Sequence, residues 1–275
     1  MTYNNLPIEL FKKLQRDNGK ELHVDPYLCT YYYEINNQKA PFTDPRVRAA
    51  LKLGLDRDIM VNKVLAQGQK PAYSYTPPST DGMDILPPDW FTWSQDKRNA
   101  EAKKLLAEAG YTADKPLTFN LLYNTSDLHK KLAIAASSIW KKNIGVNIKL
   151  ENQEWKTFLD TRHQGNYDVS RAAWCADYNE PTSFLNTMVS NSSSNTSHYK
   201  SDEFDKVVRD AIKAPDAKAR AADYQKAEQI LDKDSTIVPV YYYVNTRLVK
   251  PYVGGYTGKD PLDKTLSKDF YIIKH

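Results

Sequence analysis

The sequence predicts an α/β fold (mixed α+β) in which helices flank a mixed sheet. Segments with a strand pattern alternate with segments with a helical pattern along the 275 residues. Such alternation is typical of helices packed on the faces of a sheet. Hydrophobic residues make up 41% and charged residues 26% of the chain, a balance that supports a packed core. The length suggests roughly two domains, or one large one.

The predicted strands are short runs in which β-branched and aromatic residues dominate or alternate with polar ones. The last of them is strongly apolar. The predicted strands cover residues 29–35, 117–122, 146–150, 167–174 and 237–244.

The predicted helices are marked by apolar residues on one face and by clear start signals. Thr43 or Asp44 can cap one of them, and Ser94 and Ser126 can cap two longer ones, since their side-chain oxygens accept from the first free N–H groups. The predicted helices cover residues 8–14, 45–55, 56–64, 97–109, 126–140, 155–161, 204–212 and 217–231.

Two further stretches are expected at the surface. Residues 67–95 are rich in Pro, Ser, Gly and Trp, which favours a long surface connection. The short Ser/Asn run at 191–197 is expected to be a surface loop.

Charge and hydropathy exclude several functions. The net charge is +4, but acidic and basic residues are interspersed and form no basic stripe, so no nucleic-acid partner is expected. No run approaches the roughly 18 apolar residues of a membrane helix. The first residues lack a charged region followed by an apolar run, so they are not a signal peptide. A mature or truncated product, or a cytosolic protein, fits this start.

Catalytic motifs are absent from the sequence. There is no Gly-x-Ser-x-Gly elbow, no His-Glu-x-x-His and no Cys/His cluster, so we expect no enzyme, no metal and no cofactor. Cys29 and Cys175 are the only cysteines and could form a disulfide or remain two buried thiols. The 19 Tyr and 5 Trp against 8 Phe suit a wet binding cleft or a tyrosine-rich core equally well.

Several segments together resemble the oligopeptide receptors of a family of periplasmic solute-binding proteins that serve ABC importers of dipeptides, oligopeptides and nickel. The run WCADYNEP at 174–181 and the two cysteine positions are the most specific signals. The resemblance runs essentially from end to end of the chain. The other segments lie at 29–37, 50–58, 122–131, 154–163 and 238–243.

The resemblance implies a periplasmic-binding-protein-like type II lobe and an incomplete chain. Family members have two lobes that close on a ligand and are about twice this length, so the chain is similar to the carboxy-terminal part alone. Met1 would then be an internal methionine. By this analogy residues 1–28 are a remnant of the first lobe, 29–244 form the second, ligand-binding lobe, and 245–275 return to the first lobe.

The same resemblance implies a function and partners. Full-length relatives are periplasmic, and the expected ligands are short peptides of about two to five residues, held without catalysis by their backbone and termini. The expected protein partner is the membrane permease of an ABC importer, and the receptor is expected to be a monomer. A murein-peptide receptor of the same fold and a cytosolic truncated fragment remain alternatives.

Charged residues at both ends of a ligand groove are implied by the matched positions. Asp177 corresponds to the residue that pairs with the ligand's ammonium, although by itself it also reads as a turn residue. Arg171 and His129 correspond to residues near the ligand's carboxylate, which His129 can meet when protonated. Arg162 corresponds to another cleft cation, or else to a solvent-facing helix residue.

The strand from Arg171 to Cys175 is expected to run beside the ligand and to hydrogen-bond its backbone, as an edge strand does. Ala173 stands where relatives have glycine, so the ligand backbone could approach this strand differently here. Leu65 stands where relatives have lysine, which leaves the preferred peptide length open. The resemblance also implies a Cys29–Cys175 disulfide in an oxidising compartment. Pocket walls, unless they are core residues, are Trp155, Trp174, Tyr32 and Tyr243, with Tyr27, Asn124 and Glu34 as weaker candidates.

Overall fold

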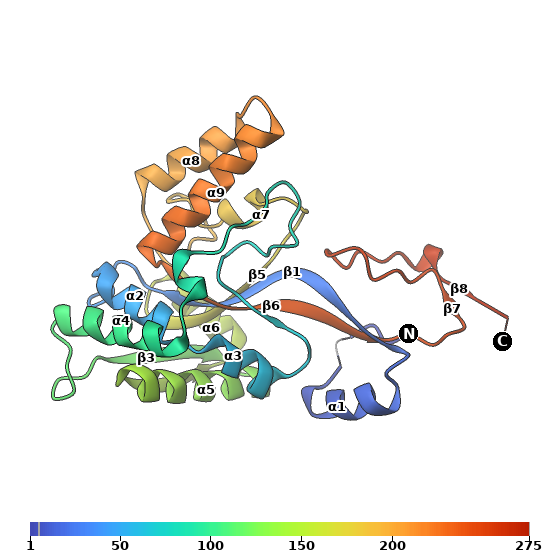
Figure 1. The fold of residues 1–275 in the computed structure, drawn as a ribbon, viewed down its shortest axis with the longest axis horizontal. Coiled ribbons are helices and arrows are strands. Elements are labelled where there is room, and N and C mark those ends of the chain that lie inside the picture. The colour runs from blue at the N-terminus through green and yellow to red at the C-terminus, as the bar shows by residue number, and fades with distance from the viewer. Residues whose placement is uncertain (5, 275) are drawn as a thin grey trace.

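A computed structural model describes residues 1–4 and 6–274 and shows a mixed sheet between layers of helices (Figure 1). The predicted α/β class is therefore confirmed. The sheet has 6 strands in the order β2-β6-β1-β5-β3-β4, and a separate pair is formed by β7 and β8. The strands are β1 (Leu22–Ile35), β2 (Lys70–Pro71), β3 (Thr118–Asn124), β4 (Asn147–Gln153), β5 (Val169–Cys175), β6 (Ile237–Leu248), β7 (Val253–Gly254) and β8 (Tyr271–Ile272).

The helices begin where the sequence places caps. Asp44 accepts from the N–H of Arg46, and Ser94 and Ser126 accept from residues three positions on. The α-helices are α1 (Ile8–Asp17), α2 (Pro45–Gly54), α3 (Arg57–Ile59), α4 (Gln95–Glu108), α5 (Asp127–Ile144), α6 (Trp155–His163), α7 (Thr182–Leu185), α8 (Asp202–Ile212) and α9 (Ala217–Asp234), with a π-helical turn η1 (Met60–Leu65) and 3-10 turns η2 (Asp89–Thr92) and η3 (Ser267–Asp269).

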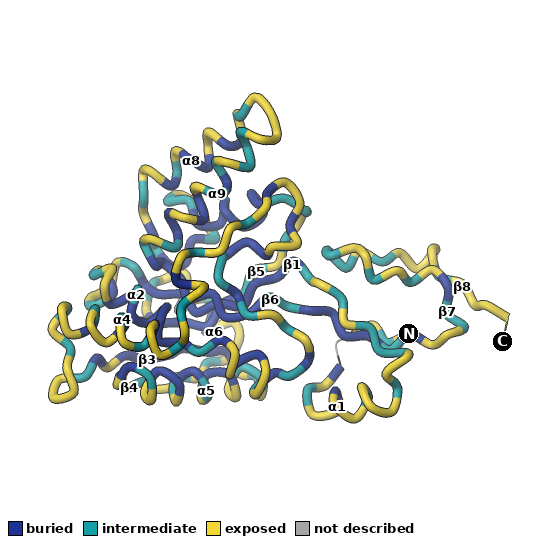
Figure 2. Tube along the Cα trace, viewed as in Figure 1, coloured by how far each residue is buried: buried dark blue, intermediate teal, exposed yellow. Residues whose placement is uncertain are grey.

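Alternation along β1 divides the core into layers. Successive side chains of a strand point to opposite faces. Tyr31 and Tyr33 therefore pack in one cluster with residues of α2, α4 and α5, while Tyr32 packs in a second cluster with residues of α7, α8 and α9. Figure 2 shows the central strands dark blue between the helices, whereas α1 and the β7–β8 hairpin are largely exposed.

β1 and β6 are longer than the sequence predicts. β1 begins at Leu22 instead of residue 29, and β6 ends at Leu248 instead of residue 244. The two strands pair from Leu22↔Leu248 to Glu34↔Ile237, with register shifts between Pro26 and Thr30 and between Tyr31 and Tyr32. The proposed boundaries at 28/29 and 244/245 therefore fall inside continuous strands. Residues 5 and 275 of the terminal segments lie outside the described residues.

Residues 67–95 are a surface connection only in part, because several of their side chains are buried. Tyr75 and Trp90 are 1% and 6% exposed. Fully buried Arg57 donates to the carbonyls of Ala72 at 2.7 Å and Pro239 at 2.8 Å, so it joins this segment to β6. The prolines and glycines of residues 67–95 correctly indicate irregular backbone, but they do not indicate whether that backbone is buried or exposed.

The Ser/Asn run at 191–197 is also packed more deeply than expected. Asn195, Thr196 and Ser197 are 7%, 6% and 1% exposed. The Asn195 amide donates to the carbonyls of Val189 at 3.2 Å and Tyr199 at 2.8 Å, so polar side chains satisfy the buried backbone of this loop.

The disulfide expected from the resemblance is present. Cys29 and Cys175 are directly opposed in the antiparallel pairing of β1 with β5, and their sulfurs are bonded. The bridge closes a loop across a sequence separation of 146, which links the start of the domain to the strand at its centre.

Replacing both Cys29 and Cys175 with serine should lower the free energy of unfolding by about 2–5 kcal/mol, because the unfolded chain gains the freedom of a long open loop. Urea denaturation of the oxidised protein and of the double variant measures this difference. Reductant should shift the midpoint of the unsubstituted chain in the same direction and leave the variant unchanged. Equal midpoints for both proteins would contradict the expectation.

Candidate functional site

The predicted site residues gather where parallel strands end. β3 runs parallel to both β4 and β5, and the carboxyl ends of parallel strands meet at one edge of a sheet, where ligands commonly bind. Asn124 is the last residue of β3 and Gln153 the last of β4. His129 lies in the first turn of α5, and Trp155 begins α6. Strand-to-helix connections therefore place these side chains together.

Arg171 of β5 is the cation of this edge. Its Nη2 lies 2.5 Å from Nε2 of His129. Its guanidinium lies 5.7 Å from the Tyr31 ring and 6.0 Å from the Trp155 ring, within range of a cation–π interaction. Arginine can only donate, so His129 accepts through Nε2 and carries its proton on Nδ1.

His129 is neutral in this arrangement. Burial and the nearby positive charge of Arg171 lower its pKa to about 3. Without a ligand, a second cation beside Arg171 is unfavourable in a buried place, so the expectation that a protonated His129 meets a carboxylate stays a prediction. Arg171 alone supplies positive charge here, and His129 orients it.

Polar atoms at this edge are buried without a hydrogen-bond partner in the described chain. Most buried polar groups in folded proteins are paired, so a group of unpaired ones indicates where a polar ligand can bind. Tyr31 and His129 have ring centroids 5.8 Å apart, and Asn124 faces Gln153 across β3 and β4. The unpaired atoms are Tyr31 Oη, Asn124 Oδ1, His129 Nδ1, Gln153 Oε1 and Arg171 Nε.

One side of β5 is an open edge beyond Ser170. β1 pairs with β5 along its whole length, from Ile35↔Val169 to Cys29↔Cys175. β3 pairs with β5 only at Val169 and Ser170. From Arg171 to Cys175, the backbone groups that face away from β1 therefore have no strand partner among the described residues, which is the feature that strand addition requires.

Asp177 lies just beyond β5 and is exposed. Its N–H donates to Ser183 Oγ at 2.8 Å, and its carbonyl accepts from Lys264 Nζ at 3.1 Å. Within the described chain its carboxylate has no hydrogen bond or ion pair. Trp174 is half-buried, and its indole N–H donates to the carbonyl of Ser183 at 2.6 Å, while exposed Cys175 forms the disulfide.

Glu34 and Arg162 bind each other instead of facing a ligand. Glu34 is 2% exposed, and its Oε2 lies 2.8 Å from Arg162 Nη2 and 2.7 Å from Thr196 Oγ1. Burial raises the pKa of the Glu34 carboxyl, but the charge and hydrogen bonds of Arg162 outweigh it and hold the pKa below its usual range. Neither the weak pocket-wall role of Glu34 nor the solvent-facing alternative for Arg162 fits this buried pair.

The predicted tyrosines have different environments. Tyr32 is 5% exposed and packs edge-on against Tyr75 in the second core cluster, so it is a core residue and the pocket-wall expectation for it is wrong. Tyr27 and Tyr243 line a pocket of about 760 Å³ between α1, η1 and the β1–β6 ribbon. Trp155 is 49% exposed and stacks on Phe158 with ring centroids 5.7 Å apart.

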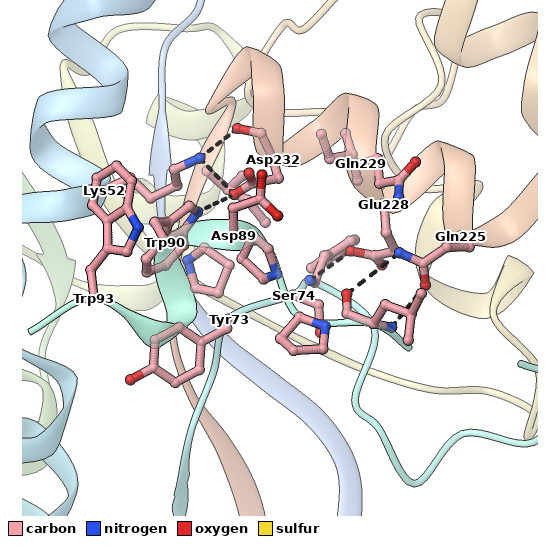
Figure 3. A pocket seen from close by; sticks show the side chains of 17 residues that line it. Lys52, Tyr73, Ser74, Asp89, Trp90, Trp93, Gln225, Glu228, Gln229 and Asp232 are labelled. Atoms are coloured by element: carbon pink, nitrogen blue, oxygen red, sulfur yellow. Dashed lines mark hydrogen bonds and ion pairs between the residues drawn. The ribbon is translucent and has the colours of Figure 1, made fainter. Parts of the chain in front are cut away.

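Another pocket, of about 460 Å³, lies between α2, α9 and residues 86–93 (Figure 3). Two of its charged groups, Lys52 and Asp232, bind each other, and a third, Glu228, binds backbone groups. Lys52 Nζ and Trp90 Nε1 both donate to Asp232 Oδ1, at 2.6 Å and 2.9 Å, and Glu228 accepts from the backbone N–H groups of Tyr75 and Thr76. None of the predicted site residues lines this pocket, and its paired groups stabilise the packing of α9.

Sequence reasoning missed Tyr31, Gln153 and Thr196. Tyr31 belongs to a predicted strand, but nothing in the sequence separates it from the adjacent core tyrosines. Gln153 lies beyond the strand predicted at 146–150, and only the structure shows that β4 extends to it. Thr196 lies in the loop that was expected at the surface.

Within the described residues there is no group of three or more His, Cys, Asp or Glu side chains that could hold a metal ion. No described helix has the length and apolar character needed to cross a membrane.

Replacing Glu34 with glutamine should destabilise the fold by about 3–5 kcal/mol, because Arg162 then remains buried without its counter-charge. The pKa of Glu34 is lowered on folding, so the contribution is present above pH about 4.5 and declines as pH falls through the lower value of the folded state. Urea titrations at pH about 7 and about 4 measure it.

The double variant Glu34→Gln with Arg162→Met is the control, since it removes both charges. It should recover much of the stability lost in the single variant. A single variant as stable as the unsubstituted chain would contradict the buried pair.

His129 should also make stability depend on pH. The unfolded chain takes up its proton near pH 6.5, whereas the folded chain does so only near about 3, so the free energy of unfolding declines as pH falls between these values. His129→Gln, which can still accept from Arg171, should flatten this decline in urea titrations. A ring-proton NMR midpoint for His129 near its ordinary value would contradict the expectation.

The chain is similar to known bacterial solute-binding proteins. The model of bacterial extracellular solute-binding proteins, family 5 Middle, matches residues 1–196. The periplasmic oligopeptide-binding protein OppA of Escherichia coli K12 is 74% identical over 275 residues, which are 100% of this chain and 51% of OppA. The periplasmic murein peptide-binding protein MppA of the same organism is 47% identical over 271 residues, 98% of this chain and 50% of MppA.

A solved structure of Haemophilus influenzae OppA in complex with RPPGFSPFR superposes with a TM-score of 0.89 and is 51% identical, covering 98% of this chain and 53% of that one. The chain thus spans about half the length of the curated relatives it matches. From the family match and these identities, the chain belongs to the bacterial extracellular solute-binding proteins of family 5.

Proposed function

We propose that the chain forms the main ligand-binding part of a periplasmic receptor that binds short peptides with little sequence selectivity and delivers them to the permease of an ABC-type importer. In this proposal residues 29–244 are the ligand-binding lobe, 1–28 and 245–275 belong to the other lobe, and the receptor is a monomer. The names of the relatives, which include periplasmic oligopeptide-binding proteins, support it. The family consists of solute-binding proteins, so no catalysis is proposed.

The observation that carries the proposal is the open edge of β5 between opposite charges. Arg171 lies at one end of this edge, and Asp177 lies beyond the other. A strand rises about 3.3 Å per residue, so the edge from Arg171 to Cys175 is about 13 Å long, which suits about four ligand residues. An extended peptide can pair its backbone with β5 while its amine approaches Asp177 and its carboxylate approaches Arg171.

Low selectivity follows from the groups that the edge offers. Backbone, ammonium and carboxylate are common to all peptides, so a site that binds them does not read sequence. Half-exposed Trp155 gives an aromatic surface on which varied side chains can pack, with water filling the remaining space.

A murein-peptide receptor is the second candidate, and Arg162 argues against it. In that function Arg162 would pair with the extra carboxylate of diaminopimelate, but here it is bound to Glu34 and Thr196. Opening this buried pair for a ligand costs several kcal/mol. Competition between an ordinary tripeptide and a murein tripeptide tests the choice, and preference for the murein peptide would reverse it.

Asp177→Asn should weaken the binding of a free-amine tripeptide such as Ala-Ala-Ala by about 10- to 100-fold, because a charge-assisted hydrogen bond is worth about 1.5–3 kcal/mol. Binding to the N-acetylated tripeptide should be weak in both proteins. Calorimetric or NMR titration measures both.

Asp114→Asn is the matched control, because this exposed aspartate precedes β3 and therefore lies at the opposite end of the strand from Asn124. It should bind as the unsubstituted chain does. Equal affinity of Asp177→Asn for the free and the acetylated peptide supports the role of the carboxylate. An unchanged preference for the free amine would overturn it.

A further inference from the structure

Residues 256–264, which we call the carboxy-terminal strap, follow β7 and run past Leu28 of β1 to Asp177. The carbonyl of Pro261 accepts from the N–H of Leu28 at 2.9 Å, in the interval where β1 loses its regular pairing with β6. Leu262 packs against the second core cluster. The hydroxyl of Tyr256 donates to Asp25 at 2.5 Å. The strap is therefore fixed to β1 at several points.

The strap places a positive charge beside Asp177. Nζ of Lys264 lies 3.1 Å from the backbone carbonyl oxygen of Asp177. The backbone N–H of Lys264 donates to Oδ2 of Asp260 at 3.1 Å, and Asp263 is paired with buried Arg247. The side chain of Lys264 is exposed, so its orientation depends on this anchored backbone.

We propose that Lys264 is a specificity-determining residue for the first position of the ligand, an inference that rests on the proposed function. If Asp177 receives the ligand's ammonium, the side chain of the first ligand residue extends from the adjacent carbon atom. The ammonium of Lys264 then lies close to that side chain. It repels a lysine or arginine there and attracts an aspartate or glutamate, so it shifts the relative affinity for acidic and basic first residues.

The expected size of this effect is moderate because Lys264 is exposed. At roughly 8 Å in a surface environment, one unit charge changes an equilibrium constant about threefold, and reversing the charge changes it about tenfold. The effect should shrink at high ionic strength, since the Debye length falls from about 10 Å at 0.1 M salt to about 3 Å at 1 M. For a ligand whose first side chain is uncharged, removing the charge of Lys264 should change the affinity only through the interaction of Lys264 with the ligand's amine.

The test compares Glu-Ala-Ala with Lys-Ala-Ala in titrations of the full 275-residue chain and its Lys264→Glu variant at low salt. Affinity for Glu-Ala-Ala should fall and affinity for Lys-Ala-Ala should rise, each by about tenfold, so their ratio should move on the order of 100-fold towards the peptide that begins with lysine. High salt should largely remove this shift. Lys264→Met should give about half of the shift on a logarithmic scale.

Lys268→Glu is the matched control, because it makes the same charge change on an exposed lysine that follows the strap and has no described contact with Asp177. It should leave the ratio unchanged. An equal shift in this control, or no shift in Lys264→Glu, overturns the role of Lys264.

The two proposals fail in different ways. If the unsubstituted chain binds N-acetylated Ala-Ala-Ala as well as the free peptide, the amine site at Asp177 is wrong and the proposed function loses its central contact. If acetylation abolishes binding while Lys264→Glu leaves the ratio unchanged, the amine site stands and the inference on Lys264 is wrong.

Discussion

The antiparallel pairing of β1 with β5 is the constraint on which the candidate site depends. It runs over the full length of β5 and is bridged by Cys29–Cys175. Because β1 occupies one edge of β5 and β3 leaves the other after Ser170, the strand is rigidly held on one side and free on the other. A backbone that is fixed in this way can offer hydrogen-bonding groups without a loss of its own conformational freedom.

The two arginines at the site show that the partner, and not residue type or burial alone, decides what an arginine can do. Arg162 donates to Glu34 and Thr196, so its charge is compensated within the fold. Arg171 meets a neutral histidine and aromatic rings, so its charge is not compensated. Desolvated but unpaired charge is costly to the fold, and such a cost is common at positions that bind a partner.

The sequence was sufficient for the local elements and for much of the site. Ser94 and Ser126 mark two helix starts because their chemistry is local, and the alternation of apolar and polar residues at 146–150 marks β4. Burial of irregular segments was not readable: Trp90 and Thr196 lie in stretches whose composition is typical of loops, yet tertiary contacts bury both. The pairing of Glu34 with Arg162 joins residues separated by 128 positions, and no local pattern encodes such a contact.

The continuous strands β1 and β6 have a mechanical consequence. Within the domain their central parts lie between helices, but towards Leu22 and Leu248 the paired strands extend beyond these layers, as Figure 1 shows. There they contact residues near the amino terminus and the carboxy-terminal strap. A two-stranded ribbon twists more readily than a sheet clamped between layers. This ribbon should therefore deform more easily than the rest of the sheet. A rotation of the terminal segments would have its axis close to Leu28, whose backbone N–H donates to the carbonyl of Pro261.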